Sequence, residues 1–248
     1  MIDIRKKLID VSDKEYQNFS TKLTPNISLK ILGVRVPALK TLAKQIAKGK
    51  DVEEMYLAKG LESVIYTEEV TLYGLVISET KLSFEKFIYY LEIFIKKVDN
   101  WGTNDVVVSA LKQIDKYYIE MWDYMMKSFN NITNNLIEEQ MEVYRVRFYL
   151  VTFLCYYVKR GKEYIDEILT VIEKIKTNEY YIKMAIAWLL QVIIVKDFEE
   201  GYTFLKNYSL DNFIYKKTIS KVLESYRITD IQKERIKALR NENVLSSK

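Results

Sequence analysis

The chain has 248 residues, enough to bury a sizeable core within one domain. It contains only 2 Pro and 7 Gly, so tight turns are few and a β-sandwich or β-barrel is disfavoured. The absence of histidine excludes Ser-His and Cys-His nucleophile systems and removes the commonest neutral metal ligand. A net charge of +4 is compatible with a nucleic-acid partner but is too small to establish one.

Cysteine usage and hydropathy indicate the compartment. The one cysteine, Cys155, excludes an internal disulfide and lies in an apolar run that predicts its burial. Residues 1–10 lack the apolar core of a signal peptide. The chain also contains no stretch of about 18 uncharged apolar residues, the length needed to span a bilayer. We therefore expect a cytoplasmic protein that is neither secreted nor inserted in a membrane.

Apolar residues recur at the three- and four-residue spacing of a helix along most of the chain. Ser83 is placed to cap one such helix, Pro37 to open another, and Thr229 with Gln232 matches a capping box. We expect roughly thirteen helices joined by short polar loops. The clearest patterns cover residues 16–23, 38–47, 70–77, 84–98, 106–114, 164–175 and 213–223.

Residues 180–195 are apolar nearly all round, interrupted by Lys183 and Gln191, which predicts a helix lying between neighbouring helices. Short connections make sequential helices pack as antiparallel hairpins, which close either as a compact bundle or as a solenoid. We expect an all-α fold, a HEAT-like α-solenoid of stacked antiparallel helix pairs with a concave groove. A single domain would cover residues 1–248, with 241–248 frayed.

Four residues stand out as candidates for chemistry. Trp101 and Asp105 have the i, i+4 spacing that places two side chains on one helical face. Arg147 follows Trp101 by 46 residues and Trp188 follows Arg147 by 41, intervals close to one HEAT-type repeat. Stacking of repeats would therefore bring all four to one concave surface. The structural alternative makes each Trp a core residue, Asp105 a cap and Arg147 a snorkelling side chain. For Trp122 and the tyrosines we expect a structural role only.

Basic residues form two groups on predicted helices. Arg35, Lys40 and Lys44 form one stripe, and Lys216, Lys217 and Lys221 form the other group. Both groups are candidates for phosphate contacts, although basic residues on helices most often form a solvated face.

Several motifs together resemble the AlkD-type DNA alkylation repair family. Residues 32–40 resemble its Gly-Val-Arg-x-Pro segment and basic helix, and Asn100-Trp101 with Asp105 resembles its Trp-x-x-x-Asp motif. Arg147 resembles the arginine that the family carries within an apolar helix, and residues 185–188 resemble the family's Ala-x-x-Trp helix. Residues 66–74 and 211–227 add further similarity, in the expected order along most of the chain.

The resemblance implies a HEAT-like DNA glycosylase acting on duplex DNA, without base flipping. Alkylation at N3 or N7 gives a purine a positive charge and makes it a good leaving group. The carboxylate of Asp105 and the aromatic faces of Trp101 and Trp188 would stabilise positive charge on the deoxyribose, while Arg147 holds a phosphate.

The enzyme so implied uses no metal and no cofactor, and we expect it to be a monomer. The basic residues expected to contact DNA are Arg35, Lys40, Lys44, Arg145, Lys183, Lys216, Lys217 and Arg227. Two alternatives remain: a non-catalytic HEAT-like module that binds distorted or branched nucleic acid, and a protein-binding solenoid.

Overall fold

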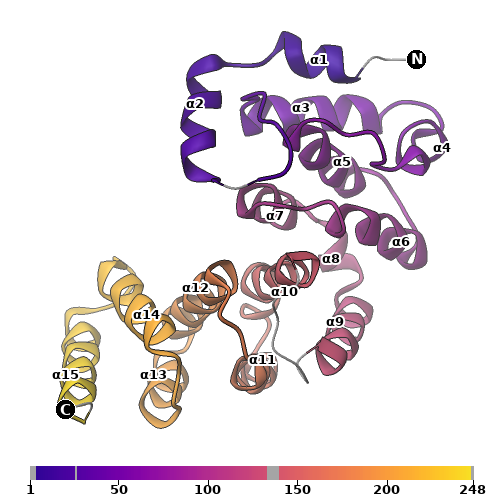
Figure 1. The fold of residues 1–248 in the computed structure, drawn as a ribbon. Helices are drawn as coiled ribbons and strands as arrows, with labels where there is room; N and C mark the ends of the chain where they lie inside the picture. The colour runs from indigo at the N-terminus through magenta and orange to yellow at the C-terminus, as the bar shows by residue number, and fades with distance from the viewer. Residues whose placement is uncertain (1–3, 26, 133–139, 247–248) are drawn as a thin grey trace. The chain divides into compact units, whose positions relative to one another are not determined.

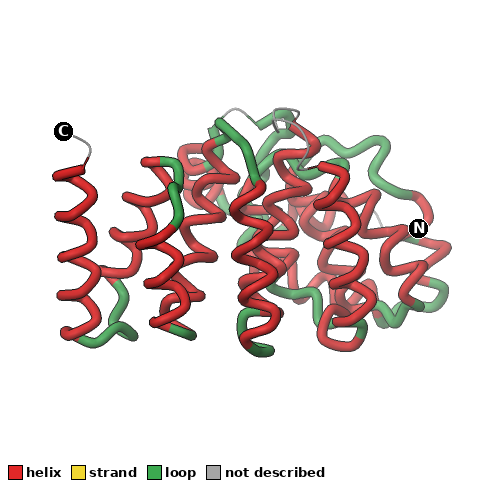
Figure 2. The backbone as a smooth tube through the Cα atoms, turned by 90° about the horizontal axis from the view of Figure 1, so that it is seen from below, coloured by secondary structure: helices red, strands yellow, loops and turns green. Residues whose placement is uncertain are grey.

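The computed structural model describes residues 4–25, 27–132 and 140–246. Helices joined by short loops make up this part of the chain, and its only strand-like pairing is an isolated bridge between Lys30 and Tyr66 (Figure 2). The all-α class is therefore confirmed. The contacts divide the chain into two compact units, the first built from residues up to 126 with 140–148 and the second from 127–132 with 149–246. That residues 1–248 act as one domain stays a prediction.

In the first unit, α5 is the central helix, since it packs against α3, α6 and α7 (Figure 1). Most of its residues are buried. Gly74 of α5 lies so close to α7 that an added Cβ would fall 2.6 Å from a methyl group of Val107. The helices that contribute to this unit are α1 (Ile4–Asp10), α2 (Lys14–Leu23), α3 (Val36–Ala47), α4 (Val52–Met55), the 3-10 helix η1 (Leu57–Lys59), α5 (Thr67–Glu79), α6 (Phe84–Ile95), α7 (Trp101–Val108), α8 (Gln113–Lys116), α9 (Tyr118–Ile132) and α10 (Gln140–Thr152).

The segment between α2 and α3 is held by a buried carboxylate. Glu68 of α5 accepts hydrogen bonds from the backbone N–H groups of Leu32, Gly33 and Val34, the shortest 2.7 Å from Gly33. Gly33 has a φ of +88°, and a Cβ there would lie 2.4 Å from the carbonyl oxygen of Asp13. Glycine is therefore required both by the backbone conformation and by the close approach of α2.

In the second unit, α12 packs against both α13 and α14, and α15 packs against α13 and α14. Gly201 permits the close approach of α13 to α12, because a Cβ there would lie 2.4 Å from the side chain of Ile194. The expectation that residues 180–195 lie between neighbouring helices is confirmed. The elements are the π-helical turn η2 (Phe153–Tyr157), α11 (Lys162–Lys174), α12 (Tyr180–Lys196), α13 (Phe198–Asn207), α14 (Asn212–Glu224) and α15 (Asp230–Ser246).

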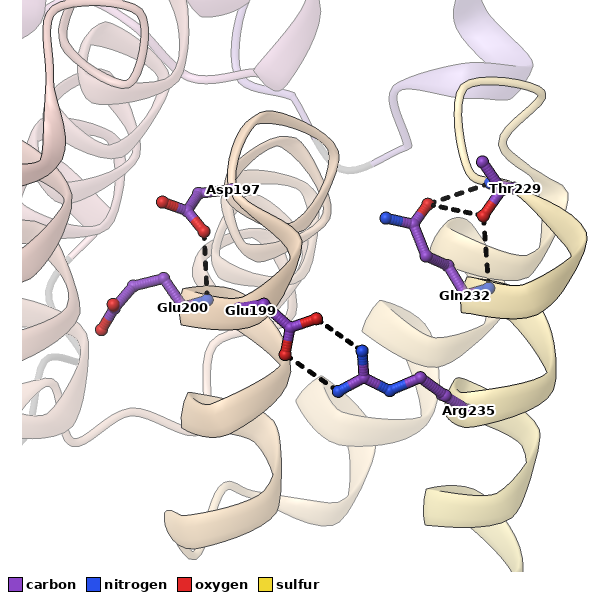
Figure 3. Close-up of polar contacts among 6 residues, drawn as sticks. All are labelled: Asp197, Glu199, Glu200, Thr229, Gln232 and Arg235. Carbon is purple, nitrogen blue, oxygen red and sulfur yellow. Dashed lines mark hydrogen bonds and ion pairs between the residues drawn. The ribbon is translucent and has the colours of Figure 1, made fainter.

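The last helix is capped and anchored as Figure 3 shows. Gln232 Oε1 accepts from the N–H of Thr229 at 3.0 Å, and Thr229 Oγ1 accepts from the N–H of Gln232 at 3.3 Å, which confirms the predicted capping box. Arg235 forms a two-pronged ion pair with Glu199 of α13 and lies 4.4 Å from the ring centroid of Tyr202. These contacts fix α15 on α13. The Arg235 hydrogen bond lowers the pKa of Glu199.

Several smaller predictions can be compared with the structure. Ser83 caps α6, since its Oγ accepts from the N–H of Lys86, and Trp122 is buried as expected. Cys155 is only half-buried, because it lies in the π-helical turn that rotates residues out of the α-helical register. Residues 241–246, expected to fray, continue α15, and 247–248 lie outside the described part. Within the described chain, fifteen α-helices replace the predicted thirteen, since the four-residue α4 and α8 are too short to show periodicity.

Candidate functional site

Buried polar side chains mark one part of the first unit. Of the ten buried polar or charged side chains in the described chain, seven lie on α5, on α7 or directly before α7. A core that only needed to pack would use apolar residues there, because each buried polar group must find a partner. This concentration makes the surroundings of α7 the candidate site.

The start of α7 is fixed by Asn100. Its Oδ1 accepts from the N–H of Thr103 at 2.8 Å, the geometry of an N-cap. Its amide nitrogen donates to the hydroxyl of Thr67 on α5 at 2.8 Å and to the carboxylate of Asp99 at 3.0 Å. Because Asn100 is buried and bonded in several directions, the first turn of α7 is held rigidly against α5.

Asp99 extends this network to the connection between α2 and α3. Its Oδ2 accepts from the N–H and hydroxyl of Ser28, at 2.9 and 2.7 Å, and from the N–H of Leu29 at 3.1 Å. The sequence did not predict these contacts of Asp99 and Asn100. The feature of the sequence that could have indicated these contacts is that two residue types favoured as helix caps, Asp and Asn, stand next to each other directly before a helical pattern.

Trp101 opens α7 and is half-buried. Its indole Nε1 donates to the carbonyl oxygen of Leu23 at the end of α2, at 3.2 Å. A cavity of about 120 Å³ lies beside it between α2, α3, α5 and α7, and Tyr16, Phe19 and Val36 contribute to its largely apolar lining. The N–H of the indole is thus engaged within the protein, so the ring offers a partner mainly its π face.

Asp105 and Arg147 form a two-pronged ion pair. Arg147 Nε donates to Asp105 Oδ1 at 3.0 Å, and Arg147 Nη2 donates to Asp105 Oδ2 at 2.7 Å. The side chain of Arg147 is 6% exposed and that of Asp105 is 16% exposed. The fork of Arg147, for which we predicted a phosphate partner, is directed at Asp105 in this structure. The two hydrogen bonds fix the orientation of the carboxylate, and a small part of it stays exposed to solvent.

Arg145, two residues before Arg147, is also paired. It donates from both terminal nitrogens to Glu92 of α6, at 2.6 and 2.9 Å, and Tyr124 of α9 donates to the same carboxylate. Burial raises the pKa of Glu92, but the hydrogen bonds from Arg145 and Tyr124 outweigh it, and the net pKa is lowered. Only 11% of the Arg145 side chain is exposed. A phosphate contact by Arg145 would require this ion pair to open.

The basic stripe on α3 begins with a paired residue. Arg35 donates to Asp13 at 2.9 Å, and its guanidinium lies 5.0 Å from the ring centroid of Tyr16. A backbone hydrogen bond from Tyr16, followed by the Arg35 side chain, lowers the pKa of Asp13. Lys40 and Lys44 are exposed on the same helix.

The remaining predicted site residues lie in the second unit. Trp188 is half-buried on α12. Lys183, also on α12, forms an ion pair of 3.0 Å with Asp211, which caps α14. Lys216, Lys217 and Arg227 are exposed.

The first unit therefore brings Trp101, Asp105 and Arg147 together. Whether Trp188 belongs to the same site stays a prediction. Asn104, also missed by sequence reasoning, donates from its amide nitrogen to Asp105 Oδ1 at 3.0 Å. Asn104 lies on the buried face of α7, but a polar residue at this position looks in the sequence like an asparagine on the surface.

The described residues show neither a metal-binding cluster nor a membrane-spanning helix. They contain no group of three or more Cys, Asp or Glu side chains arranged to hold a metal ion. None of their helices is long and apolar enough to cross a membrane.

The comparison with known families decides the relationship. The family model described as "DNA alkylation repair enzyme" matches residues 4–222, which include Trp101, Asp105, Arg147 and Trp188. The chain belongs to the DNA alkylation repair enzyme family. No curated protein matches the chain significantly. The family resemblance seen in the sequence is confirmed. The candidate site therefore belongs to an α-helical protein of the DNA alkylation repair enzyme family. The match ends within α14, so α15 lies beyond it.

Proposed function

We propose that this protein is a DNA N-glycosylase that releases cationic N3- or N7-alkylated purines from duplex DNA without flipping the base. The observation that carries the proposal is the Asp105 carboxylate, which is held by the buried fork of Arg147 and has a small exposed fraction. Family membership supplies DNA alkylation repair as the context. The lesion, the bond broken and the absence of flipping are parts of the proposal.

The proposed reaction requires electrostatic stabilisation of the transition state and little acid catalysis. The alkylated purine already carries the positive charge, so the C1′–N bond breaks with its electron pair going to the base, which leaves neutral. Positive charge then develops on the deoxyribose. Water adds to C1′ and loses a proton to solvent, giving an abasic site. A preorganised carboxylate lowers the barrier because it opposes the charge that develops in the transition state.

The residues around Asp105 have distinct roles in this proposal. Arg147 holds the carboxylate in place, since its Nε and Nη2 each donate a hydrogen bond to Asp105. Trp101 lies one helical turn away on α7 and would place its π face against the sugar. Trp188, on α12, is proposed to have the same role. Neither a metal nor a cofactor is required.

The exposed basic residues would bind phosphates. Lys40 and Lys44 of the first unit, and Lys216, Lys217 and Arg227 of the second, are exposed side chains suited to this role. Such contacts fix the register of the duplex and carry no base specificity. Arg35, Arg145 and Lys183 already have acidic partners and would need to exchange them for phosphate.

A direct assay tests the proposal. Purified protein is incubated with methylated duplex DNA, and free 3-methyladenine and 7-methylguanine are measured at saturating protein. We expect release of at least one cationic base and accumulation of abasic sites. Release of neither base by a folded protein would contradict the proposal.

One observation favours a second candidate, a module that binds nucleic acid without cleaving it. Arg147 is 5% exposed, and its pairing with Asp105 would equally serve to stabilise a fold. In the same assay this candidate predicts retained DNA binding with no released base.

A further inference from the structure

Asn104 is an unusual core residue. It is completely buried on α7, at a position whose helical neighbours Val107 and Val108 are also buried. Its side-chain Oδ1 has no hydrogen-bond partner among the described residues. An apolar side chain of similar size would avoid an unsatisfied carbonyl, so packing alone does not explain an asparagine here.

Helix capping does not explain Asn104 either. The N-cap of α7 is Asn100, whose Oδ1 already accepts from Thr103. The described hydrogen bond of the Asn104 side chain is the one from Nδ2 to Asp105 Oδ1, at 3.0 Å. The orientation of the amide is set by this bond, because the reversed amide would place two oxygen atoms against each other.

The contact completes the support of the Asp105 carboxylate. Oδ1 receives hydrogen bonds from Arg147 Nε and Asn104 Nδ2, and Oδ2 receives one from Arg147 Nη2. Three donors from two helices fix the plane of the carboxylate. The amide is neutral, so it adds orientation without cancelling any further negative charge.

We infer that Asn104 is a positioning residue whose buried amide holds the Asp105 carboxylate in its reactive orientation. The inference deepens the proposed glycosylase function and rests on it for the effect on base release. Asn104 itself does not touch the DNA. The unsatisfied Oδ1 is the cost of placing a donor at this point in the core.

The first test is Asn104→Leu, which removes both the donor and the unsatisfied carbonyl while keeping the branched four-atom skeleton of the side chain. We expect thermal stability and DNA affinity to stay close to wild type, while single-turnover base release falls about 10-fold or more, because the Asp105 carboxylate loses one of the donors that orient it. Thr218→Val, a buried polar-to-apolar change in α14, is the control and should leave base release intact. Full base release by folded Asn104→Leu would overturn the inference.

The second test, Asn104→Asp, distinguishes orientation from packing. The introduced carboxyl repels Asp105 when ionised, but when protonated it donates a hydrogen bond in place of the amide. Arg147 is the charged group that faces Asp105 from α10, and the buried carboxylates Glu68 and Asp99 are bound to backbone N–H groups of residues 28–34. Base release by this variant, relative to wild type at each pH, should recover as the pH falls. Asn104→Leu should show no such recovery.

A stability measurement keeps this test separate from the proposed function. If the introduced carboxyl lies against Asp105, the unfolding temperature of Asn104→Asp relative to wild type rises as the pH is lowered from neutral. The rise should be smaller when Asp105 is also changed to Asn, which separates repulsion by Asp105 from burial alone. This result is expected even if wild-type protein releases no base, in which case the glycosylase proposal fails and the contact stands. A pH-independent difference in unfolding temperature would overturn the positioning contact itself.

Discussion

The guanidinium of Arg147 and the carboxylate of Asp105 join α10 to α7 through two hydrogen bonds of 3.0 and 2.7 Å in a largely buried setting. This arrangement makes each residue the other's partner, where the sequence suggested one partner on the sugar and one on a phosphate. A buried pair of this kind is more informative about orientation than about net stability, since desolvation offsets much of the Coulomb attraction.

The first prediction concerns the cost of breaking this pair. Arg147→Ala leaves Asp105 as a largely buried carboxylate without its main partner, so we expect unfolding free energy to fall by about 3–5 kcal/mol. Arg147→Lys keeps the charge but not the fork, and should lose less stability while still impairing base release. Urea denaturation and single-turnover assays measure the two effects. An unchanged midpoint for Arg147→Ala would show that the pair contributes nothing to the fold.

The second prediction is that DNA binding is electrostatic. The log-log dependence of affinity on salt should have a slope of several units with little sequence preference. Lys217→Gln, an exposed position, should reduce the slope by about 1. Arg145→Gln should leave the slope unchanged, because that side chain is bound to Glu92. A reduced slope for Arg145→Gln would instead place Arg145 on a phosphate, as the sequence suggested.

The third prediction uses the lowered pKa of Glu92. A folded-state pKa below the unfolded value gives stability that is present above the unfolded pKa and lost as the pH falls through the folded one. In Arg145→Met the carboxylate keeps its burial but loses its main partner, so its pKa should rise. The variant's stability deficit should therefore shrink as the pH is lowered from neutral towards mildly acidic values. A deficit that is constant across this range would contradict the ion pair.

The fourth prediction concerns Gly33, where a positive φ coincides with a close backbone contact. Gly60 has a positive φ of 62° but meets only Ile93, at 3.9 Å, and serves as the matched control. Gly60→Ala should cost about 1–3 kcal/mol from backbone strain alone, because a φ of 62° with a ψ of −156° is a conformation that essentially only glycine adopts. Gly33→Ala should cost clearly more, because the new Cβ would force Asp13 and α2 to move. Equal midpoints for the two variants in thermal unfolding would show that α2 moves away from the new Cβ without loss of stability.

Helical periodicity predicted most of the fold because apolar residues of α6, α11 and α14 repeat at helical spacing and meet their neighbours along one face. The same signal fails for α4 and α8, each four residues long. It also fails for the π-helical turn at Cys155, where the register changes inside an otherwise regular apolar pattern.

The candidate site was predictable in part. The i, i+4 spacing placed Trp101 and Asp105 on one helix, and that requires only local geometry. The partners of Asp105 depend on tertiary contacts between residues 42 apart, so the sequence did not predict the pairing with Arg147. Glu68 and Glu92 were missed for the same reason. Each is a carboxylate within a helical pattern, and only the packed fold shows what it binds.

The last prediction separates catalysis from binding at Asp105. Asp105→Asn keeps the shape and one acceptor for Arg147 but removes the negative charge that opposes the sugar cation. Turnover should fall by about 100- to 1000-fold, or about 3–4 kcal/mol in the barrier. Affinity should hold or rise slightly, because a carboxylate near phosphates repels DNA. Losing one hydrogen bond to a charged partner should lower stability by about 1–3 kcal/mol, so base release must be measured below the variant's unfolding temperature.

Asp123→Asn, an exposed position on α9, is the matched control and should leave base release, affinity and stability unchanged. Single-turnover base release at saturating protein is the deciding measurement, since it reports the chemical step without contributions from binding or product release. If Asp105 served only to pair with Arg147, the folded Asp105→Asn variant would release base at the wild-type rate. That result would remove Asp105 from the mechanism and leave the pair as a structural contact between α7 and α10.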